Sequence, residues 1–363
     1  MPEVPPFPRS TPALSQPVTH GFPGRAANLI QSIGYSLGKV HTGLLAYLCD
    51  RHREGKVEPL TFLFGSLGVP VPRSPVPKRE WQSIDLAIFD GNADEPCILV
   101  EMKVDDHDHE TRKWIQGRQE VGPQTDIYAR AFPKCSSYLY ITLGLGQYFH
   151  RPYGTRFRWV RLHEFAHALE QMGTTERVIE DWKVAIRREA SLHECVRRND
   201  RSCLSEYRSG AWNICFLGQL REAVEEAAAS KGIDATCYMW GTRPDTILNF
   251  GYAKNPIYLE VKHPVYLEVN NNGRLNLKVN VEDCADVACR QSAIGELIAR
   301  VQAASPAPTY RIREGGRLGA SKTVASFDIG LLVTDGCIGF AQDMDYTLQQ
   351  LGETLRHFYG SVS

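Results

Sequence analysis

Two apolar runs joined by a polar turn, at residues 83–90 and 97–104, carry charged side chains in their interior. The segment reads SIDLAIFDGNADEPCILVEMKV, and these side chains are Asp85, Glu101 and Lys103. Short apolar runs separated by Asp, Gly and Asn are typical of β-strands joined by a turn. An ionised side chain in a protein core is costly unless it is paired or bound to a metal. The chain therefore either exposes these strands at an edge or binds something there.

Alternation along the two predicted strands places the three groups on one face. Successive side chains of a strand point to opposite faces, so Glu101 and Lys103 share a face and Met102 lies on the other. Antiparallel pairing of the strands brings Asp85 beside Glu101. The hard oxygen ligands of two carboxylates suit Mg²⁺ or Mn²⁺. A salt-bridged sheet face is the structural alternative, because ion pairs of this kind also occur without a ligand.

The rest of the chain predicts two domains. Its 363 residues are 43% hydrophobic, which is enough for a sizeable core. A proline-rich tail at 1–25 precedes a first domain at 26–172, where helical and strand patterns alternate. Residues 173–363 then predict helices, a meander of strands, a helix at about 286–303, a hairpin around Asp335 and Gly336, and a terminal helix. We expect an α/β fold with a mixed central sheet flanked by helices, followed by a second α+β domain.

Charge, cysteine spacing and hydropathy restrict the binding partners, the redox state of the thiols and the cellular location that the sequence predicts. Basic residues number 41 and acidic residues 42, so any nucleic-acid surface must be local. The ten cysteines form no CxxC pair, and Cys284 and Cys289 are the closest two. This pattern predicts reduced thiols in a cytoplasm, rather than a disulfide framework or a zinc knuckle. The sequence contains no stretch with the length and hydropathy of a membrane span, and residues 1–25 lack the apolar core of a signal peptide.

The order of the charged residues resembles the PD-(D/E)xK nuclease superfamily, in which an Asp at a hairpin is followed by Glu-x-Lys on the next strand. Position 84 is Ile where the name-giving Pro would stand. The similarity to one bacterial branch covers about residues 26–170. HTGLLAYLCD at 41–50 resembles a first helix of the form HSxxLAWLLDP, and QTDIYAR, with Gln124 and Tyr128, resembles a QLxRY-like helix. YLYITLG at 138–144 resembles a strand ending in LTP, and WVRLHEFAHAL at 159–169 resembles a Trp leading into a helix.

The resemblance implies a restriction-endonuclease-like fold and Mg²⁺- or Mn²⁺-dependent hydrolysis of phosphodiester bonds, above all in DNA. Asp85 and Glu101 would hold the metal, assisted by the Met102 carbonyl. Lys103 would position the attacking water, and Gln124 would support it. Bacterial nucleases of this type often act in restriction or phage defence, in the cytoplasm, and a homo-oligomer is compatible with that role.

The family pattern has one departure in the first helix. That helix often carries a Glu just before its His-Ser pair, whereas this chain reads SLGKVHT at 36–42, with Gly38 and no acid. A metal ligand is then absent or replaced by another group. A nuclease fold without catalytic activity, kept as a binding module, is therefore an alternative function.

A second and more literal match to the nuclease motif lies at 243–263, in RPDTILNFGYAKNPIYLEVKH. It contains Pro244, Asp245, Glu260 and Lys262. The sequence after Lys262 predicts a further hairpin, whereas the sequence after Lys103 predicts the helix and strand that a parallel crossover needs. We therefore favour the first motif.

The stretch HEFAH, from His163 to His167, matches the HExxH motif of zinc peptidases. On a helix, the spacing of four puts both imidazoles on one face, with Glu164 as general base. The nearest suitable downstream acid for a third ligand is Glu189, at an imperfect spacing. A zinc metallopeptidase is thus the second alternative function, and its histidines are ordinary surface residues in the nuclease interpretation.

Overall fold

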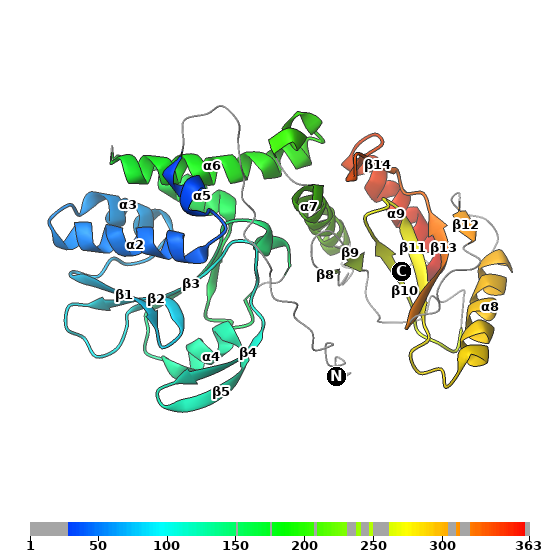
Figure 1. Ribbon diagram of the computed structural model, residues 1–363, viewed down its shortest axis with the longest axis horizontal. Coiled ribbons are helices and arrows are strands. Elements are labelled where there is room, and N and C mark those ends of the chain that lie inside the picture. Colours follow the sequence, from blue (N-terminus) through cyan, green and yellow to red (C-terminus); the bar gives the residue numbers. More distant parts are fainter. Residues whose placement is uncertain are drawn as a thin grey trace. The chain divides into compact units, whose positions relative to one another are not determined.

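The computed structural model describes residues 28–149, 152–174, 176–206, 209–230, 237–240, 247–249, 261–303, 310–312 and 320–359. These residues form a mixed α/β structure with several sheets, which confirms the predicted α/β class. The chain divides into two compact units (Figure 1). Unit 1 comprises residues 1–144 and 151–188, and unit 2 comprises residues 145–150 and 189–363.

Unit 1 is built on a mixed five-stranded sheet in the order β1-β2-β3-β6-β7. Strands β1, β2 and β3 pair antiparallel, whereas β3 with β6 and β6 with β7 pair parallel. The strand with the Glu-x-Lys sequence, β3, is therefore central, at the switch between the two pairing modes. The bounds are β1 (Pro75–Trp81), β2 (Ile84–Asp90), β3 (Ile98–Lys103), β6 (Ser137–Thr142) and β7 (Arg158–Val160).

Strand β1 begins inside a cluster of prolines at positions 70, 72, 75 and 77. Pro75 and Pro77 are tolerated there because β1 is an edge strand, and proline cannot donate to an interior ladder. A two-residue turn joins β1 to β2, with Gln82 at φ 52° and Ser83 at φ 65°. Positive φ at both central residues matches the twist of a tight hairpin. The turn places Asp85 at the second position of β2.

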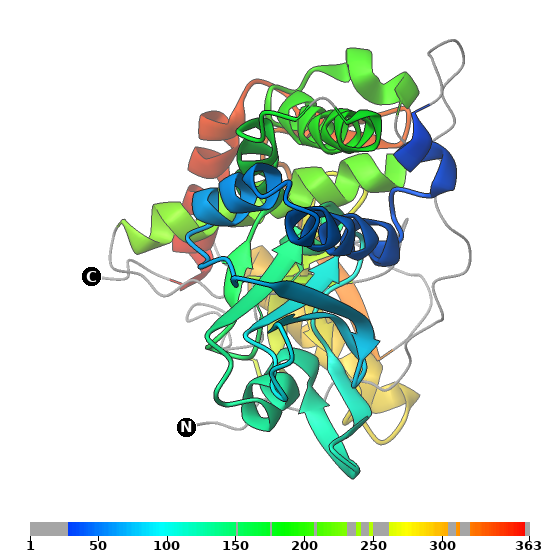
Figure 2. The same cartoon turned by 90° about the vertical axis from the view of Figure 1, so that its left-hand side faces the viewer.

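Helices cover both faces of this sheet (Figures 1 and 2). On one face lie α2 (Gly38–Arg53), α3 (Glu58–Ser66), α5 (Leu162–Glu170) and the start of α6 (Arg177–Arg197), with the short α1 (Leu29–Ile33) nearby. On the other face lie α4 (Gln124–Ala131) and a two-stranded hairpin of β4 (Glu110–Ile115) and β5 (Arg118–Pro123). The core between the sheet and α4 includes Ala87, Leu99, Ile127, Tyr128 and Tyr140.

The sequence predicted the domain boundary at residue 172, whereas unit 1 extends to residue 188 and includes the first part of α6, which begins at Arg177. The reason is a buried hydrogen-bonded contact. Trp182 donates from Nε1 to Nδ1 of His41 at 2.9 Å, and His41 Nε2 lies 2.7 Å from the Tyr35 carbonyl. Because Nδ1 accepts, Nε2 carries the proton and the imidazole is neutral. His41 therefore joins α2 to α6 within unit 1.

Unit 2 contains a six-stranded antiparallel sheet in the order β12-β13-β11-β10-β9-β8 and a separate hairpin of β14 and β15. The strands are β8 (Tyr238–Trp240), β9 (Ile247–Asn249), β10 (Val265–Val269), β11 (Leu275–Asn280), β12 (Tyr310–Ile312), β13 (Ser321–Phe327), β14 (Leu331–Thr334) and β15 (Cys337–Phe340). The predicted hairpin is confirmed, with Asp335 at φ 53° and Gly336 at φ 74° in its turn.

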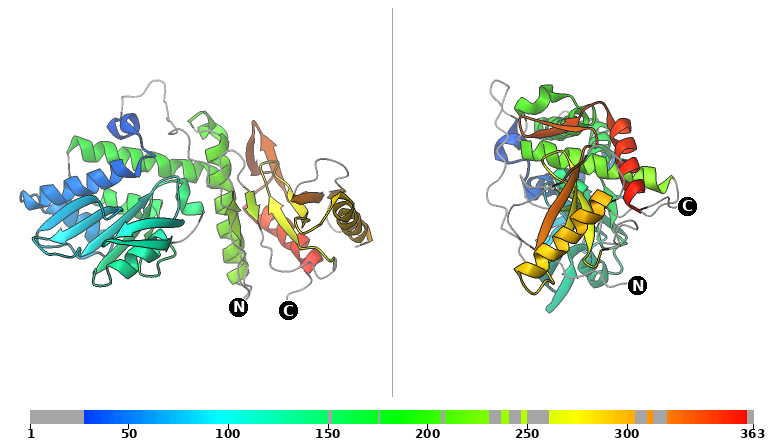
Figure 3. Two further views of the ribbon diagram at one scale, coloured as in Figure 1. Left: turned by 60° about the horizontal axis from the view of Figure 1, so that its bottom comes forward. Right: turned by 90° about the vertical axis from the view of Figure 1, so that its right-hand side faces the viewer.

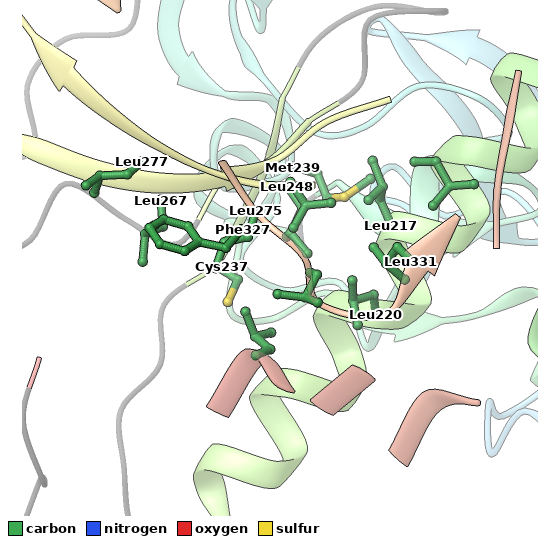
Figure 4. Close-up of a cluster of buried hydrophobic side chains, with 14 of the residues drawn as sticks. Leu217, Leu220, Cys237, Met239, Leu248, Leu267, Leu275, Leu277, Phe327 and Leu331 are labelled. Carbon is green, nitrogen blue, oxygen red and sulfur yellow. The ribbon is translucent and has the colours of Figure 1, made fainter. Parts of the chain in front are cut away.

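The helices of unit 2 are α7 (Ser209–Ala229), α8 (Val287–Ala303) and α9 (Met344–Tyr359), which confirms the predicted helix at 286–303 and the terminal helix. Helix α8 packs against β11 and β13 (Figure 3). Leu217 and Leu220 of α7 belong to one buried core with Leu248, Leu275 and Phe327 of the sheet (Figure 4). No helix in the described ranges is long and apolar enough to cross a membrane.

The cysteines depart from prediction at one pair. Cys195 and Cys203 form a disulfide with a Cα–Cα distance of 6.6 Å, and the other eight cysteines are free. The prediction of reduced thiols is therefore wrong for this pair. The turn after α6 brings the two residues within bonding reach. Their separation of eight residues carries no signal in the sequence.

Candidate functional site

Strands β2 and β3 bring Asp85 toward Glu101, as the alternation predicts. Their ladder pairs Leu86 with Val100, so one further step in the same register places Asp85 opposite Glu101. Oδ2 of Asp85 accepts a hydrogen bond from the backbone N–H of Met102 at 2.8 Å. This bond fixes the Asp85 carboxylate beside β3.

The Glu101 carboxylate is fully buried, with 0% of the residue exposed. Oε1 lies 2.8 Å from Nζ of Lys103, whereas Oε2 has no hydrogen-bond partner within the part of the chain that the structure describes. Burial raises the pKa of Glu101 to about 8, and the negative charge of Asp85 adds to the rise. Two carboxyl groups lie beside one ammonium here, so a bound cation could take the place of the proton on the second carboxyl group.

Lys103 remains protonated in this setting. Burial alone would lower the pKa of its ammonium, but the ion pair with Glu101 and the charge of Asp85 outweigh burial and raise it. The same ammonium donates a hydrogen bond to Oε1 of Gln124 at 3.0 Å. Lys103 is therefore held between the carboxylate and an amide, and it acts as a fixed cation rather than as a proton acceptor.

A hydrogen-bonded chain continues from Lys103 to the β1–β2 turn. Gln124 Nε2 donates to the Tyr128 hydroxyl at 2.9 Å, and that hydroxyl donates to the Ser83 carbonyl. Gln124 and Tyr128 are four residues apart on α4, so both point to the same side of the helix. Burial raises the pKa of Tyr128, and the charge of Glu101 adds to this, so the group stays a phenol. The sequence predicted Gln124 beside the site, and the structure adds Tyr128 as its support.

The departure at Gly38 has a steric cause. Gly38 is the first residue of α2, and a β-carbon built on it would lie 3.0 Å from the Met102 carbonyl oxygen. Such a contact is tighter than ordinary packing, so glycine lets α2 begin directly against β3. Any larger side chain there, an acid included, requires the helix or the strand to shift.

The loop after β3 contains a titratable residue that was not predicted from the sequence, His107. Burial lowers its pKa, and the cation of Lys103 is among the charges that act on it. Buried Asp108 anchors this loop, because it accepts hydrogen bonds from the backbone N–H groups of Thr125 at 3.3 Å and Tyr153 at 3.0 Å. The run DDHDH at 105–109, one residue after Glu-x-Lys, is the signal that would have indicated it.

The β4–β5 hairpin, beside α4, exposes an apolar and basic surface. Trp114 is 67% exposed and Val121 is 61% exposed, and Val121 lies opposite Arg112, which shares the face of Trp114. Lys113 points the other way, and its charge acts on both Asp85 and Glu101. The sequence predicted no strands in this stretch. The turn at Gln116 and Gly117, with φ of 51° and 74°, was the missed signal.

The competing zinc-peptidase motif lies on α5. His163 and His167 are exposed on α5, and Glu164 is ion-paired with Arg158. The described residues gather three potential metal-ligand atoms within 4.8 Å in two places, neither of which involves α5. Glu189, the acid considered as a third zinc ligand, lies 3.6 Å from His193.

In the second nuclease motif, only Lys262 of the four motif residues lies within the described ranges. Pro244, Asp245 and Glu260 lie outside them. Lys262 is exposed, and the chain continues into β10 and β11. The hairpin predicted after this motif is thereby confirmed.

No protein-family model, curated protein or solved structure matches this chain. The resemblance to PD-(D/E)xK nucleases therefore stays a prediction. The chemistry of the site has to be argued from its own residues, of which Asp85, Glu101, Lys103 and Gln124 lie within one connected network.

Proposed function

We propose that unit 1 is a divalent-metal-dependent nuclease with a PD-(D/E)xK-type site on a restriction-endonuclease-like sheet. The observation that carries this proposal is Glu101, a fully buried carboxylate with one oxygen unpaired among the described residues and a second carboxylate beside it. A purely structural ion pair would balance one carboxylate with one ammonium. The carboxyl group in excess of the ammonium is free to lose its proton to a bound cation.

Asp85 and Glu101 would hold the ion, with the Met102 carbonyl as an additional oxygen ligand. Carboxylate and carbonyl oxygens are the donors that Mg²⁺ and Mn²⁺ prefer. When bound, the ion would polarise the scissile phosphate and offset the negative charge that develops on it.

The side chains around the ion position the other reactant. Lys103, held as an ammonium by Glu101 and Gln124, would orient the attacking water and stabilise developing negative charge. Tyr128 keeps Gln124 in place by bridging it to the Ser83 carbonyl. Ser83 belongs to the β1–β2 turn that also positions Asp85. The same hydrogen-bonded chain therefore connects the segment that carries Asp85 to Gln124 and Lys103.

The substrate we propose is DNA, and the β4–β5 hairpin is the surface that would receive it. Trp114 offers an exposed ring on which a base can stack, and Arg112 and Arg118 are cations on the same hairpin for phosphates. A local basic and aromatic surface is what a chain of net charge −1 needs for such a substrate. Restriction or phage defence in the cytoplasm, by a monomer or homo-oligomer, is the biological setting that the family resemblance suggests.

The direct test is nicking of a supercoiled plasmid with and without Mg²⁺, with labelled single-stranded RNA as the second substrate. We expect cleavage of DNA that stops with chelator. Trp114→Ala should raise KM several-fold while kcat and metal affinity stay unchanged, because one stacked base is worth about 1–3 kcal/mol. Phe62→Ala, which removes an exposed aromatic ring from α3, is the matched control. The absence of metal-dependent cleavage of either substrate would contradict the proposal.

A further inference from the structure

Three metal-ligating side chains meet in unit 2, away from the proposed nuclease residues in the sequence. His263, Cys284 and Cys289 place their ligand atoms within 4.8 Å of one another, and all three lie in described segments. Cys284 is buried, whereas His263 and Cys289 are half-buried. The third ligand atom comes from a histidine 21 residues before Cys284, and not from a second pair of cysteines. The spacing of cysteines alone therefore does not indicate this site.

Secondary structure and backbone hydrogen bonds fix the three residues independently. His263 precedes β10, and the neighbouring Pro264 carbonyl accepts a hydrogen bond from the Asn280 N–H at the end of β11. Cys284 follows in the turn after β11. Cys289 lies in the first turn of α8, where its N–H donates to Oδ1 of Asp286 at 2.8 Å. The three ligands therefore come from three segments that meet at one end of the strands.

The spacing fits a tetrahedral metal ion. Sγ of Cys284 lies 3.8 Å from Nε2 of His263. A tetrahedral Zn²⁺ with bonds of about 2.3 Å to sulfur and about 2.0–2.1 Å to nitrogen holds those ligand atoms roughly 3.5–3.8 Å apart. Two soft thiolates and an imidazole select zinc over Mg²⁺ or Ca²⁺.

We propose that His263, Cys284 and Cys289 form a zinc site with a fourth position open to water or another ligand. The ion joins the segment before β10 and the turn after β11 to the N-terminal end of α8. Zinc bound only to folded protein stabilises the fold by its binding free energy, so the site clips α8 onto the sheet. This inference is independent of the nuclease proposal, because it uses other residues and another class of metal.

The test is zinc content of the full chain, purified with reductant and desalted in chelator-treated buffer. We expect one zinc per chain by mass spectrometry of metals. Cobalt(II) added to the metal-free protein should give a sulfur-to-cobalt charge-transfer band and the strong visible bands of tetrahedral coordination. Cys289→Ser removes a ligand, so it should lower zinc affinity at least as much as the roughly tenfold that loss of an outer-shell partner costs, and it should weaken the charge-transfer band.

Variants separate this site from the others. His263→Ala should behave like Cys289→Ser, and because both residues are half-buried these variants keep the packing around Cys284. Cys97→Ser, which changes a half-buried free thiol elsewhere, should keep all the zinc. The proposal is overturned if the reduced protein binds no zinc, if Cys289→Ser retains it, or if thiol titration finds Cys284 bonded to Cys289. Loss of zinc from His163→Ala/His167→Ala instead would assign the metal to α5.

Discussion

Each unit contains a buried glutamate paired with a lysine, and the two pairs share most of their geometry. Glu101 and Lys103 are 2.8 Å apart in unit 1, and Glu268 and Lys278 are 3.2 Å apart in unit 2. Both glutamates lie on central strands of their sheets, are at most 3% exposed, and leave Oε2 without a hydrogen-bond partner in the described segments. A buried Glu–Lys pair is therefore not enough to mark a site.

The surroundings of the two pairs differ. Asp85 adds a second carboxylate beside Glu101, whereas the residue opposite Glu268 in its ladder is the uncharged Asn276. The Lys103 ammonium also donates a hydrogen bond to Oε1 of Gln124, whereas the Lys278 ammonium lies over the ring of Tyr266. The pair in unit 2 is a charge-balanced contact between strands. The site in unit 1 has one carboxyl group more than it has paired ammonium groups, which is the property that a cation site requires.

The strongest test of this comparison is the same change at both glutamates. Glu101→Gln keeps the size of the side chain but removes the charge that would bind the ion. We expect metal affinity to drop and DNA cleavage to fall by roughly 10²–10³, the effect of losing about 3–4 kcal/mol of transition-state stabilisation. Glu268→Gln should leave both unchanged. Calorimetry with Mg²⁺ or Mn²⁺ measures metal affinity, and plasmid nicking measures cleavage. If Glu101→Gln and Glu268→Gln gave the same metal affinity and the same cleavage rate, Glu101 would be no more a metal ligand than Glu268.

The lysines allow a second matched test. Lys103→Ala removes a cation that would orient the water, so we expect cleavage to fall by about 10². The carboxylates remain, so binding of the ion should persist. Lys278→Ala should leave cleavage at the parental rate, although unit 2 should lose some stability because Glu268 is left unpaired. If Lys103→Ala abolished metal binding along with cleavage, Lys103 would be supporting the carboxylates rather than the water.

The pH dependence of stability gives a test that needs no substrate. Burial and Asp85 raise the pKa of Glu101 to about 8 in the folded, metal-free protein, from an ordinary value of 4.5. Between these values the folded state keeps a proton that the unfolded state has released. The free energy of unfolding should therefore fall as pH rises through this window, by at most about 1.4 kcal/mol per pH unit, and the contribution is fully present below it. Asp85, whose pKa burial also raises, acts in the same direction.

Glu101→Gln stays neutral at every pH and should flatten this part of the profile. Glu268→Gln is again the control. Urea denaturation in chelator at several pH values between about 5 and 8 measures the slope. A slope unchanged by Glu101→Gln would mean that the buried carboxylate does not retain its proton.

The sequence predicted the core of the site because strand alternation is a local property. Alternation puts Glu101 and Lys103 on one face, and the register that pairs Leu86 with Val100 adds Asp85 to that face. Gln124 followed from the family resemblance, and the structure places its amide against Lys103. The relations among Asp85, Glu101 and Lys103 involve neighbours in sequence or in one hairpin.

The features that the sequence missed depend on contacts between distant segments. Strand β1 was hidden by its prolines, which are tolerated only because it lies at the sheet edge. The extent of unit 1 depends on the bond from Trp182 to His41, 141 residues apart. The candidate zinc ligands likewise need β10 and β11 to pair before His263 meets the cysteines. Such contacts have no periodicity that a single sequence displays.

The smallest effect is expected at the motif that looks strongest in the sequence, HEFAH. His163 and His167 lie on the exposed side of α5, and Glu164 is paired with Arg158, whereas the network around Glu101 is built from β2, β3 and α4. His163→Ala with His167→Ala should change DNA cleavage by less than about twofold and leave the melting temperature nearly unchanged, as for surface substitutions in general. The same variant should keep its zinc if His263, Cys284 and Cys289 hold it. A folded double variant that no longer cleaved DNA would place the nuclease site at α5 rather than at β2 and β3, and the comparison between the two Glu–Lys pairs would lose its basis.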